Sequence, residues 1–542
     1  MKILQLHLKL LIRTKWCWLF FPLFCFFSYG AIYDSMYNLS LSGYVTQTLI
    51  FFGAMFAYYN HIRKKKEVGE YVSVLPYFRT SQMWMILAES IYIVLLLLLM
   101  TGFVFVYGVY LGAEGWLLKE AMIYCFIYFW LPCFVSLSYG YIMGSGTPRK
   151  FHVLLIIGVG LLVGPVMRHF WYCILVVLCG TKIADKIIGA ISIGQASICT
   201  TADSFYGFQI EQGRIYYLLF IIGCLWSIYF LKKRRRGWQS AVAIIVTALM
   251  AILYLNSGRY VIYDQMSEEL SARENYDLYY YMEHESFYHA GNSVIEGIEG
   301  NVKLRKNLFF EGRLKLRSKE NIKDTSFILY HDLEVKNIEG ENVKGFEQKA
   351  DSVRVYFDKE IQKDEVYFIK IKYEGYSSPY FYSNEKGCFL PGYFAWLPSE
   401  GEGSCFKVKG WALKLRNIVN ENQNYDIKVD SRYPYYFKQG TLISNNHMKR
   451  YRENEVEVIS PVKLDQDRRK KLIQMNRCIS KGRIKEIILV PNEGGTNRIY
   501  STVYGRTYFA DSFFWLYRDT NLSKKYLKEE WEEAVQCAKE AP

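Results

Sequence analysis

Residues 215–257 read IYYLLFIIGCLWSIYFLKKRRRGWQSAVAIIVTALMAILYLNS, with the basic run Lys232–Arg236 between two uncharged apolar runs. A helix needs about 20 mostly apolar residues to cross the hydrocarbon core of a bilayer. Basic residues beside such a helix mark its cytoplasmic end. The stretch therefore predicts two membrane-spanning helices that are joined on the cytoplasmic side.

The composition of the chain changes after this stretch. The 542 residues carry 66 Lys+Arg and 52 Asp+Glu, a formal charge of +14. Residues 1–256 hold 21 basic and 9 acidic residues, or +12, whereas residues 257–542 hold 45 and 43, or +2. With 17% aromatic residues and no long heptad array, the chain is not a disordered, collagen-like or coiled-coil protein. We expect a membrane half and a soluble half, and the nearly neutral soluble half gives no electrostatic reason for a nucleic-acid partner.

The membrane half contains seven apolar stretches that are candidates for spans. They are residues 16–33, 35–60, 84–112, 121–145, 151–167, 215–231 and 237–257. If the amino terminus is cytoplasmic, 16 of the 21 basic residues lie on the cytoplasmic side, as the positive-inside rule requires. We predict a six-span domain over residues 1–237 and a seventh span over 238–257 in a multi-pass protein of the cell membrane. Residues 258–542 are then extracytoplasmic.

Residues 168–213 do not fit a simple span. Their apolar runs, 170–179 and 183–198, are short, and counting the first as a span would reverse the charge distribution. We predict a broken, partly inserted outer hairpin, because irregular backbone within a membrane is tolerated where protein or water shields it. An interfacial amphipathic helix is the alternative. The breaks are predicted at Gly180, Gly189 and Gly194.

The segment between the second and third stretches, residues 61–83, has a specific order of elements. It runs from a basic stretch through Glu67-Val68-Gly69 to Leu75-Pro76 and a nearby Arg. Basic residues alone could be a cytoplasmic anchor, and Pro76 alone a helix start. The order resembles the cytoplasmic loop of type-2 ABC transporter permeases, where a basic stretch, E-x-G, a short helix, L-P and an Arg follow one another. Glu70 departs from that family, in which Thr usually follows the Gly.

This resemblance covers residues 16–231 and implies a transport function. It implies a short coupling helix near residues 68–75 that docks on a cytoplasmic ABC ATPase dimer and transmits its motion. It also implies a second permease subunit, identical or related. The chain has no G-x-x-x-x-G-K-[ST] phosphate loop, so ATP is expected on the partner and no cofactor on this chain. The implied coupling residues are Arg63, Lys64, Lys65, Lys66, Glu67, Gly69, Glu70, Pro76 and Arg79.

Glu89 interrupts the third apolar stretch, five residues after Trp84. A carboxylate within a membrane helix is costly and is by default a functional-site hypothesis. Glu89 is therefore a candidate residue of the transport pathway, although its closeness to Trp84 at the start of the stretch favours a structural role. The alternative is a position near the inner interface, where it would pair with a cytoplasmic Arg or Lys.

The soluble half changes its pattern along the chain. Residues 258–291 predict a helical stalk or connector, and residues 461–542 a mixed α/β tail. Between them, residues 292–460 predict short alternating strands at the spacing of a β-sandwich. The fold class is therefore an α-helical transmembrane bundle followed by an extracytoplasmic β-sandwich-like domain. The predicted strands include residues 302–308, 313–317, 326–333, 352–357, 366–373, 405–408 and 425–429.

A second resemblance lies in residues 366–400, VYFIKIKYEGYSSPYFYSNEKGCFLPGYFAWLPSE. A strand that ends in Glu374-Gly375, an aromatic loop and a W-x-P approach, Trp396-Leu397-Pro398, resemble the amino-terminal β-domain of gluzincin aminopeptidases. Those peptidases bind zinc through H-E-x-x-H, which this chain lacks. His284 and His289 are five residues apart, which places them about 140° apart on a helix. We therefore expect no metal site and a non-catalytic domain.

Six aromatic residues of this region have two interpretations. They could form a surface for an apolar or peptide ligand, or they could be the buried core of the domain, where aromatic rings bury large areas. Cys388 and Cys405 lie nearby, and the sequence leaves open whether they form a disulfide. The six residues are Tyr373, Tyr380, Phe381, Tyr393, Phe394 and Trp396.

Taken together, these features favour an ABC transporter permease subunit. We expect an exporter of a peptide or lipid-like substrate, with an outer domain that gates the pathway or recognises cargo. A membrane-tethered binding or sensor protein is the alternative, and it would need no ATPase. A membrane-anchored zinc peptidase is disfavoured by the absence of H-E-x-x-H.

Overall fold

The protein forms two compact units in a computed structural model, and each is described here by itself. The first is Met1–Ala202 with Gly207–Arg259, and the second is Asp203–Tyr206 with Tyr260–Pro542. The structure describes residues 2–12, 38–39, 42–72, 78–110, 113–145, 150–195, 200–201, 213–232, 237–256, 277–278, 280–305, 307–378, 387–409, 412–416, 423–453, 455–460, 484–490, 499–501 and 506–510, with isolated positions between these ranges.

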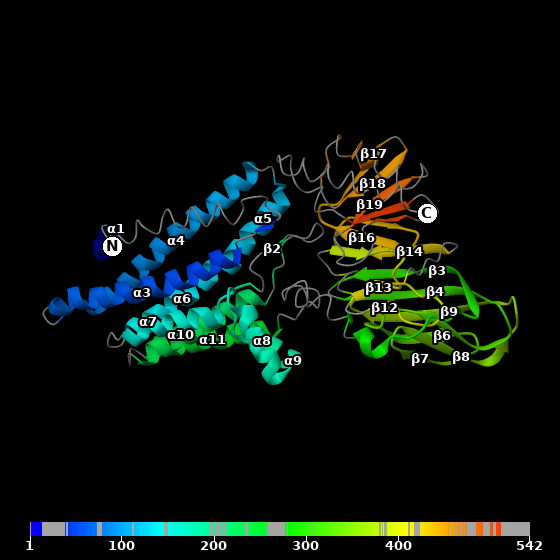
Figure 1. Ribbon diagram of the computed structural model, residues 1–542, viewed down its shortest axis with the longest axis horizontal. Helices are drawn as coiled ribbons and strands as arrows, with labels where there is room; N and C mark the ends of the chain where they lie inside the picture. The colour runs from blue at the N-terminus through cyan, green and yellow to red at the C-terminus, as the bar shows by residue number, and fades with distance from the viewer. Residues whose placement is uncertain are drawn as a thin grey trace. The chain divides into compact units, whose positions relative to one another are not determined.

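The first unit is helical, as its apolar stretches predict (Figure 1). Three of its helical runs are long and apolar enough to cross a membrane: Trp84–Tyr110, Gly115–Gly144 and Arg214–Leu231. The helices are α1 (Lys2–Ile12), α3 (Ser42–Val72), α4 (Phe78–Tyr110), α5 (Gly115–Cys125), the π-helical turn η1 (Phe126–Trp130), α6 (Leu131–Gly144), α7 (Lys150–Val163), α8 (Arg168–Cys179), α9 (Thr181–Ile191), α10 (Arg214–Lys232) and α11 (Gly237–Asn256). A helical unit with candidate spans is thus confirmed for the described residues. The count of six or seven spans and the orientation stay predictions, and the whole stretch 16–33 lies outside the described residues.

The first part of the predicted outer hairpin, residues 168–191, forms α8 and α9. A bend of 75° separates Phe151–Val163 from Arg168–Cys179, so α7 and α8 are one broken span or a re-entrant pair. Gly180, with φ of 80°, breaks the chain between α8 and α9, as predicted. The predicted break at Gly189 is wrong, because α9 continues through it to Ile191. Ala184 and Ile188 are buried four residues apart, a helical repeat that outweighs the single glycine.

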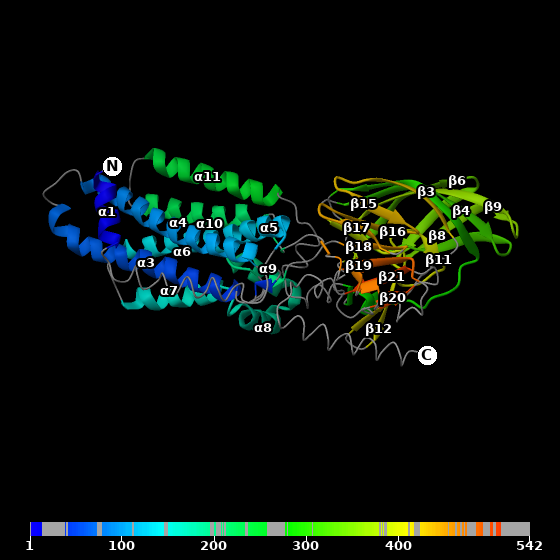
Figure 2. The same cartoon turned by 90° about the horizontal axis from the view of Figure 1, so that it is seen from above.

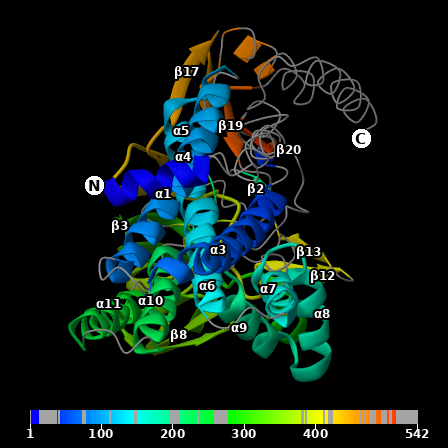
Figure 3. The ribbon, with the colours of Figure 1, turned by 90° about the vertical axis from the view of Figure 1, so that its left-hand side faces the viewer.

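Close contact between α3 and α6 organises the helical unit (Figure 3). Gly140 and Gly144 on α6 form a G-x-x-x-G pair, which lets two membrane helices approach until their backbones touch. A Cβ atom at Gly140 would overlap the Ala54 carbonyl oxygen on α3 and lie 2.9 Å from the Ala57 Cβ. A Cβ at Gly144 would lie 3.0 Å from the Cβ of His61. Figure 2 shows a second close pair, α10 beside α11.

The second unit is built from several β-sheets, which confirms the predicted β-rich character of residues 292–460 (Figure 2). A five-stranded sheet has the order β14-β3-β4-β9-β6, with β14 parallel to β3 and the other pairs antiparallel. A four-stranded sheet has the order β11-β5-β8-β7. The strands are β3 (Ser293–Leu304), β4 (Leu308–Ser318), β5 (Ile322–Ile328), β6 (Leu333–Gly340), β7 (Val343–Lys349), β8 (Ser352–Ile361), β9 (Val366–Gly375), β11 (Ser399–Glu400) and β14 (Asn424–Asp430).

Three further sheets complete this unit. They are three-stranded (β10-β16-β15), two-stranded (β12-β13) and five-stranded (β17-β18-β19-β21-β20). Their strands are β10 (Gly387–Leu390), β12 (Phe406–Lys409), β13 (Ala412–Leu415), β15 (Tyr435–Lys438), β16 (Thr441–Asn445), β17 (Lys449–Glu453), β18 (Val456–Ser460), β19 (Glu486–Val490), β20 (Ile499–Ser501) and β21 (Arg506–Ala510).

Two of the predicted strands are wrong in their bounds. Residues 302–308 span the turn between β3 and β4, where the Arg305 N–H donates to the Asn307 carbonyl at 3.1 Å. Residues 326–333 contain the end of β5 and the start of β6, with a turn between them. In both cases apolar residues flank a short turn that carries no Gly or Pro, so the alternating pattern runs through it.

We expect Gly140→Ala to lower the free energy of unfolding by about 1–3 kcal/mol, because the added methyl group overlaps α3 in a packed interface. Gly158→Ala on α7 is the matched control, since a Cβ there meets nothing within 4 Å and should change stability by less than about 0.5 kcal/mol. The melting temperatures of the two variants in detergent check this. Equal melting temperatures would contradict close α3–α6 packing.

Candidate functional site

Glu89 on α4 is completely buried in the helical unit. The Tyr141 hydroxyl on α6 donates a hydrogen bond to Glu89 Oε2. Tyr141 is itself buried, at 1% exposure, so the two groups meet away from the surface of the unit. A charged group in such a place is stable only with polar partners, which the phenol supplies.

Aromatic rings of two more helices lie near Tyr141. Its ring lies 6.3 Å from the His61 ring of α3 in an edge-on arrangement, and 6.2 Å from the Trp226 ring of α10. Residues of α3, α4, α6 and α10 therefore converge around one buried acid. The sequence singled out Glu89 but gave no signal for Tyr141, whose position depends on how α6 packs.

The predicted coupling residues lie around the junction of α3 and α4. Arg63 is an exposed residue of α3, which continues without interruption to Val72. Lys64 to Lys66, Glu67, Gly69 and Glu70 are in the same helix, and Arg79 lies in the first turn of α4. Pro76 falls outside the described residues, as do the side-chain positions from Lys64 onward. The coupling surface and its short helix stay predictions.

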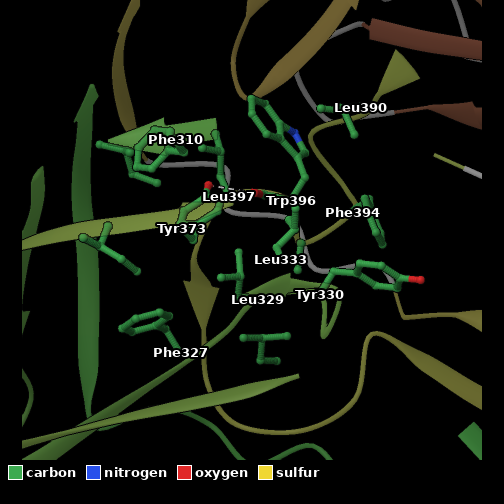
Figure 4. Close-up of a cluster of buried hydrophobic side chains, with 14 of the residues drawn as sticks. Phe310, Phe327, Leu329, Tyr330, Leu333, Tyr373, Leu390, Phe394, Trp396 and Leu397 are labelled. Carbon is green, nitrogen blue, oxygen red and sulfur yellow. Dashed lines mark hydrogen bonds between the residues drawn. The ribbon is translucent and has the colours of Figure 1, made fainter. Parts of the chain in front are cut away.

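Five of the six aromatic residues predicted as a ligand surface lie in the core of the β-rich unit (Figure 4). Tyr373 and Trp396 are fully buried: the Tyr373 hydroxyl donates to the Trp396 carbonyl at 2.8 Å, and the Trp396 indole N–H donates to the Gly440 carbonyl at 2.8 Å. The surface interpretation is therefore corrected in favour of the core, because these rings fill the space between the strands. The other three are Phe381, Tyr393 and Phe394, at 0%, 7% and 2% exposure, while Tyr380 lies outside the described residues.

Cys388 and Cys405 are both buried free thiols. No disulfide joins them, which settles the alternative that the sequence left open. Burial raises the pKa of both thiols well above the usual value, with the charge of Asp351 adding to the effect at Cys405. They are therefore poor nucleophiles in the folded protein.

A buried carboxylate, Asp351, forms a second polar centre that the sequence did not indicate. It accepts hydrogen bonds from the Tyr281 hydroxyl at 2.7 Å, the His331 backbone N–H at 2.9 Å and the Cys405 backbone N–H at 2.6 Å. The His331 Nδ1 also lies 3.1 Å from Asp351 Oδ1. Asp351 is at the turn between β7 and β8, so its partners come from three other parts of the chain.

A second buried acid, Asp277, lies beside this centre. It accepts from the Tyr330 hydroxyl and the Ser378 hydroxyl, both at 2.7 Å. Burial raises the pKa of Asp277 to about 6, although the charge of His331 and the two hydroxyl donors oppose the rise. Burial lowers the pKa of His331, but the hydrogen bond and charge of Asp351 outweigh it, so the net pKa lies above the usual value.

Among the described residues, no group of three or more His, Cys, Asp and Glu side chains is arranged to hold a metal ion. His284 Nδ1 lies 2.9 Å from the Tyr280 carbonyl oxygen, and its ring stacks on Tyr280. The His289 backbone N–H donates to the Glu402 carbonyl at 2.8 Å. These two histidines therefore belong to the packing of the segment that leads into β3.

Among known proteins, the chain is similar to solved structures of zinc metallopeptidases. No family model matches it, and no curated protein matches it. Among solved structures, an M1 zinc metallopeptidase from Deinococcus radiodurans is similar at 12% identity and a TM-score of 0.27, covering 44% of this chain and 63% of that chain. A single-residue variant of that enzyme matches at 13% identity and 0.27, covering 40% and 60%. The chain thus spans less than two thirds of these structures.

We expect Asp351→Ala to destabilise the β-rich unit by about 3–5 kcal/mol, because Tyr281, His331 and the Cys405 N–H lose a buried charged acceptor together. Asp358→Ala, an exposed change on the adjoining strand β8, should cost less than about 0.5 kcal/mol. The measurement is the urea concentration at which β9 becomes accessible to protease. Similar midpoints for both variants would show that Asp351 is not a structural centre.

Alkylation should label Cys388 and Cys405 only after unfolding, because both thiols are buried and protonated. Peptide mass spectrometry without reductant checks this. Recovery of a cross-linked peptide pair would contradict the two free thiols, and rapid labelling of the native protein would contradict their burial. Cys173, an exposed thiol on α8, serves as the positive control for labelling.

Proposed function

We propose that the chain is the permease subunit of an ABC transporter, most simply an exporter of a peptide or lipid-like substrate. A separate cytoplasmic ATPase dimer supplies the energy, and a second permease subunit, identical or related, completes the pathway. The outer β-rich unit is non-catalytic and gates the pathway or recognises cargo.

The observation that carries the proposal is the burial of Glu89 among helices. A membrane protein that only anchors a soluble domain has no need for an acid inside its helices, where its burial is costly. Tyr141 of α6 donates to this acid, and the rings of His61 and Trp226 lie around the phenol. An ionisable centre shared by several helices suits a pathway that changes shape during transport.

A second feature supports an external source of energy. The chain carries Glu67-Val68-Gly69, Leu75-Pro76 and Arg79 in the order of the permease coupling loop, and it has no phosphate-binding loop of its own. A permease half of this kind works only with an ATPase and with a second half. The proposal therefore makes a specific prediction about partners.

We expect an ABC ATPase to co-purify with the full-length protein from its native membrane. Glu67→Ala and Gly69→Leu should reduce the amount of bound ATPase about tenfold, which corresponds to about 1.4 kcal/mol of binding free energy. Lys119→Ala, an exposed change on α5 that the charge distribution places on the other side of the membrane, is the matched control. Quantitative mass spectrometry of the purified complex is the measurement.

Absence of an ATPase from the purified protein, with Glu67 and Gly69 replaceable without effect, would favour the membrane-tethered sensor instead. If the complex forms, Glu89→Gln should abolish substrate-stimulated ATP hydrolysis while leaving ATPase binding intact, because it removes the charge from the pathway but leaves the coupling loop unchanged. Unchanged stimulation would remove Glu89 from the mechanism.

A further inference from the structure

The segment of residues 277–289 docks on the β-rich unit through polar contacts. Asp277, Tyr281 and Glu285 follow one another at intervals of four residues, so they share one face of a helical turn. Asp277 accepts from Tyr330 and Ser378, and Tyr281 donates to Asp351. Glu285 accepts from the Val408 N–H at 3.2 Å and lies 3.8 Å from the Arg416 guanidinium. Side chains therefore fix this part of the segment at three positions, each four residues from the next.

Hydrogen bonds of the backbone extend this attachment to the end of the segment. The Ser286 N–H donates to Ser404 Oγ at 2.7 Å, and Arg416 donates to the Ser286 carbonyl at 2.7 Å. His289 and Glu402 exchange two backbone hydrogen bonds, at 2.8 and 2.9 Å. The segment therefore behaves as one docked element, and 20 residues separate its first residue, Asp277, from the end of α11 at Asn256.

Where the segment begins, near Asp277, acidic side chains outnumber basic ones. The carboxyl groups of Asp277, Asp332 and Asp351 surround one imidazole, that of His331, with Asp332 Oδ1 at 3.7 Å from its Nε2. The Tyr280 ring stacks on the His331 ring, with centroids 3.5 Å apart and planes 7° apart. The other titratable groups that face the cluster are Tyr281, His284, Tyr330 and Cys405.

We propose that residues 277–289 form a pH-dependent latch, which is held on the β-rich unit when His331 is charged and Asp277 is neutral, and which loosens as the pH rises. In the acidic form an imidazolium pairs with the Asp351 carboxylate and stacks on the Tyr280 ring, an arrangement that a cation strengthens. In the alkaline form a neutral imidazole faces ionised Asp277, Asp332 and Asp351. Burial makes the charge of Asp277 costly in the docked segment, and release of the segment exposes Asp277 to water.

Ionisation of Asp277 and deprotonation of His331 both weaken docking as the pH rises. The pKa of Asp277 rises from 3.8 to about 6 on docking, so ionisation opposes docking progressively between these values. The pKa of His331 is raised above 6.5 in the folded unit. Its contribution is therefore complete below pH 6.5 and is lost as the pH rises through the raised value. Docking should weaken between about pH 4 and pH 6 as Asp277 ionises, and further above pH 6.5 as His331 loses its proton.

The latch lies between α11 and β3 in the chain, so its release adds residues 277–289 to the segment that joins the two units. The inference does not need the proposed transport function, since it follows from contacts within the β-rich unit. A transporter, a sensor or any other membrane-tethered protein could use it. If residues 258–542 are extracytoplasmic, the pH that it senses is that of the exterior.

The test is amide hydrogen exchange of the full-length protein in lipid nanodiscs between pH 5 and 8, corrected for the intrinsic pH dependence of exchange. The reporters are the amides of Glu285, Ser286 and His289, which donate to Tyr281, Ser404 and Glu402 in the docked segment. We expect the corrected opening equilibrium to increase about tenfold or more from pH 5 to pH 7.5, since each unit of pKa difference corresponds to a factor of ten. Strands β4 and β9 should keep constant protection. Opening that does not change with pH would overturn the proposal.

Variants separate the latch from general destabilisation. Asp277→Asn keeps an acceptor for Tyr330 but cannot ionise, so it should remove most of the pH dependence below pH 6.5. Glu283→Gln, an exposed change in the same segment, should leave the wild-type profile. Full pH dependence in Asp277→Asn would overturn the proposal.

If Asp277→Asn does not fold, loss of protection in β4 and β9 will reveal it, and Asp332→Asn then decides. That variant changes no residue of the segment and removes a carboxylate beside His331. It should move the opening midpoint to lower pH, because the pKa of His331 falls. An unmoved midpoint would exclude His331 as the sensor.

Discussion

One buried carboxylate holds together parts of the β-rich unit that are far apart in the chain. Asp351, at the turn between β7 and β8, binds Tyr281 from the connecting segment, His331 from the turn after β5 and the Cys405 N–H from the loop before β12. A charge in this position is stable only because its lone pairs are used by donors that the fold aims at it. The positions of residues 277–289 and of two loops therefore depend on this single acid.

The helical unit also buries an acid among its helices. Glu89 is buried there with the Tyr141 hydroxyl as a donor, and Tyr141 is positioned by the close approach of α6 to α3. Small residues permit that approach, since Gly140 leaves no side chain between the backbones. In both units a buried acid marks where elements converge. The acid of the helical unit supports the transport proposal, and the acids of the β-rich unit support the latch.

Sequence patterns predicted which segments form helices and which form strands, because helices and strands depend on local chemistry. Long uncharged runs predicted helices such as α4 and α10, and alternating residues predicted strands such as β8 and β9. The same local reasoning failed at Gly189, where helical packing overrides a glycine, and at the turn of Arg305 and Asn307, which has no Gly or Pro to signal it. The dense aromatic block of residues 373–396 was recognisable, but only packing could distinguish a core from a binding surface.

By itself, the sequence determined that the chain is an apolar basic half joined to a nearly neutral β-rich half, that it has no phosphate loop or H-E-x-x-H, and that an acid lies within an apolar stretch. Only the tertiary structure decided that Tyr141 faces Glu89, that Trp396 is core, that Cys388 and Cys405 are unpaired, and that Asp277, His331 and Asp351 meet. The physical reason is the range of the interactions. Hydrophobic periodicity and charge are properties of neighbouring residues, whereas the partners of a buried acid are chosen by the packing of segments that lie 20 to 70 positions apart in the chain.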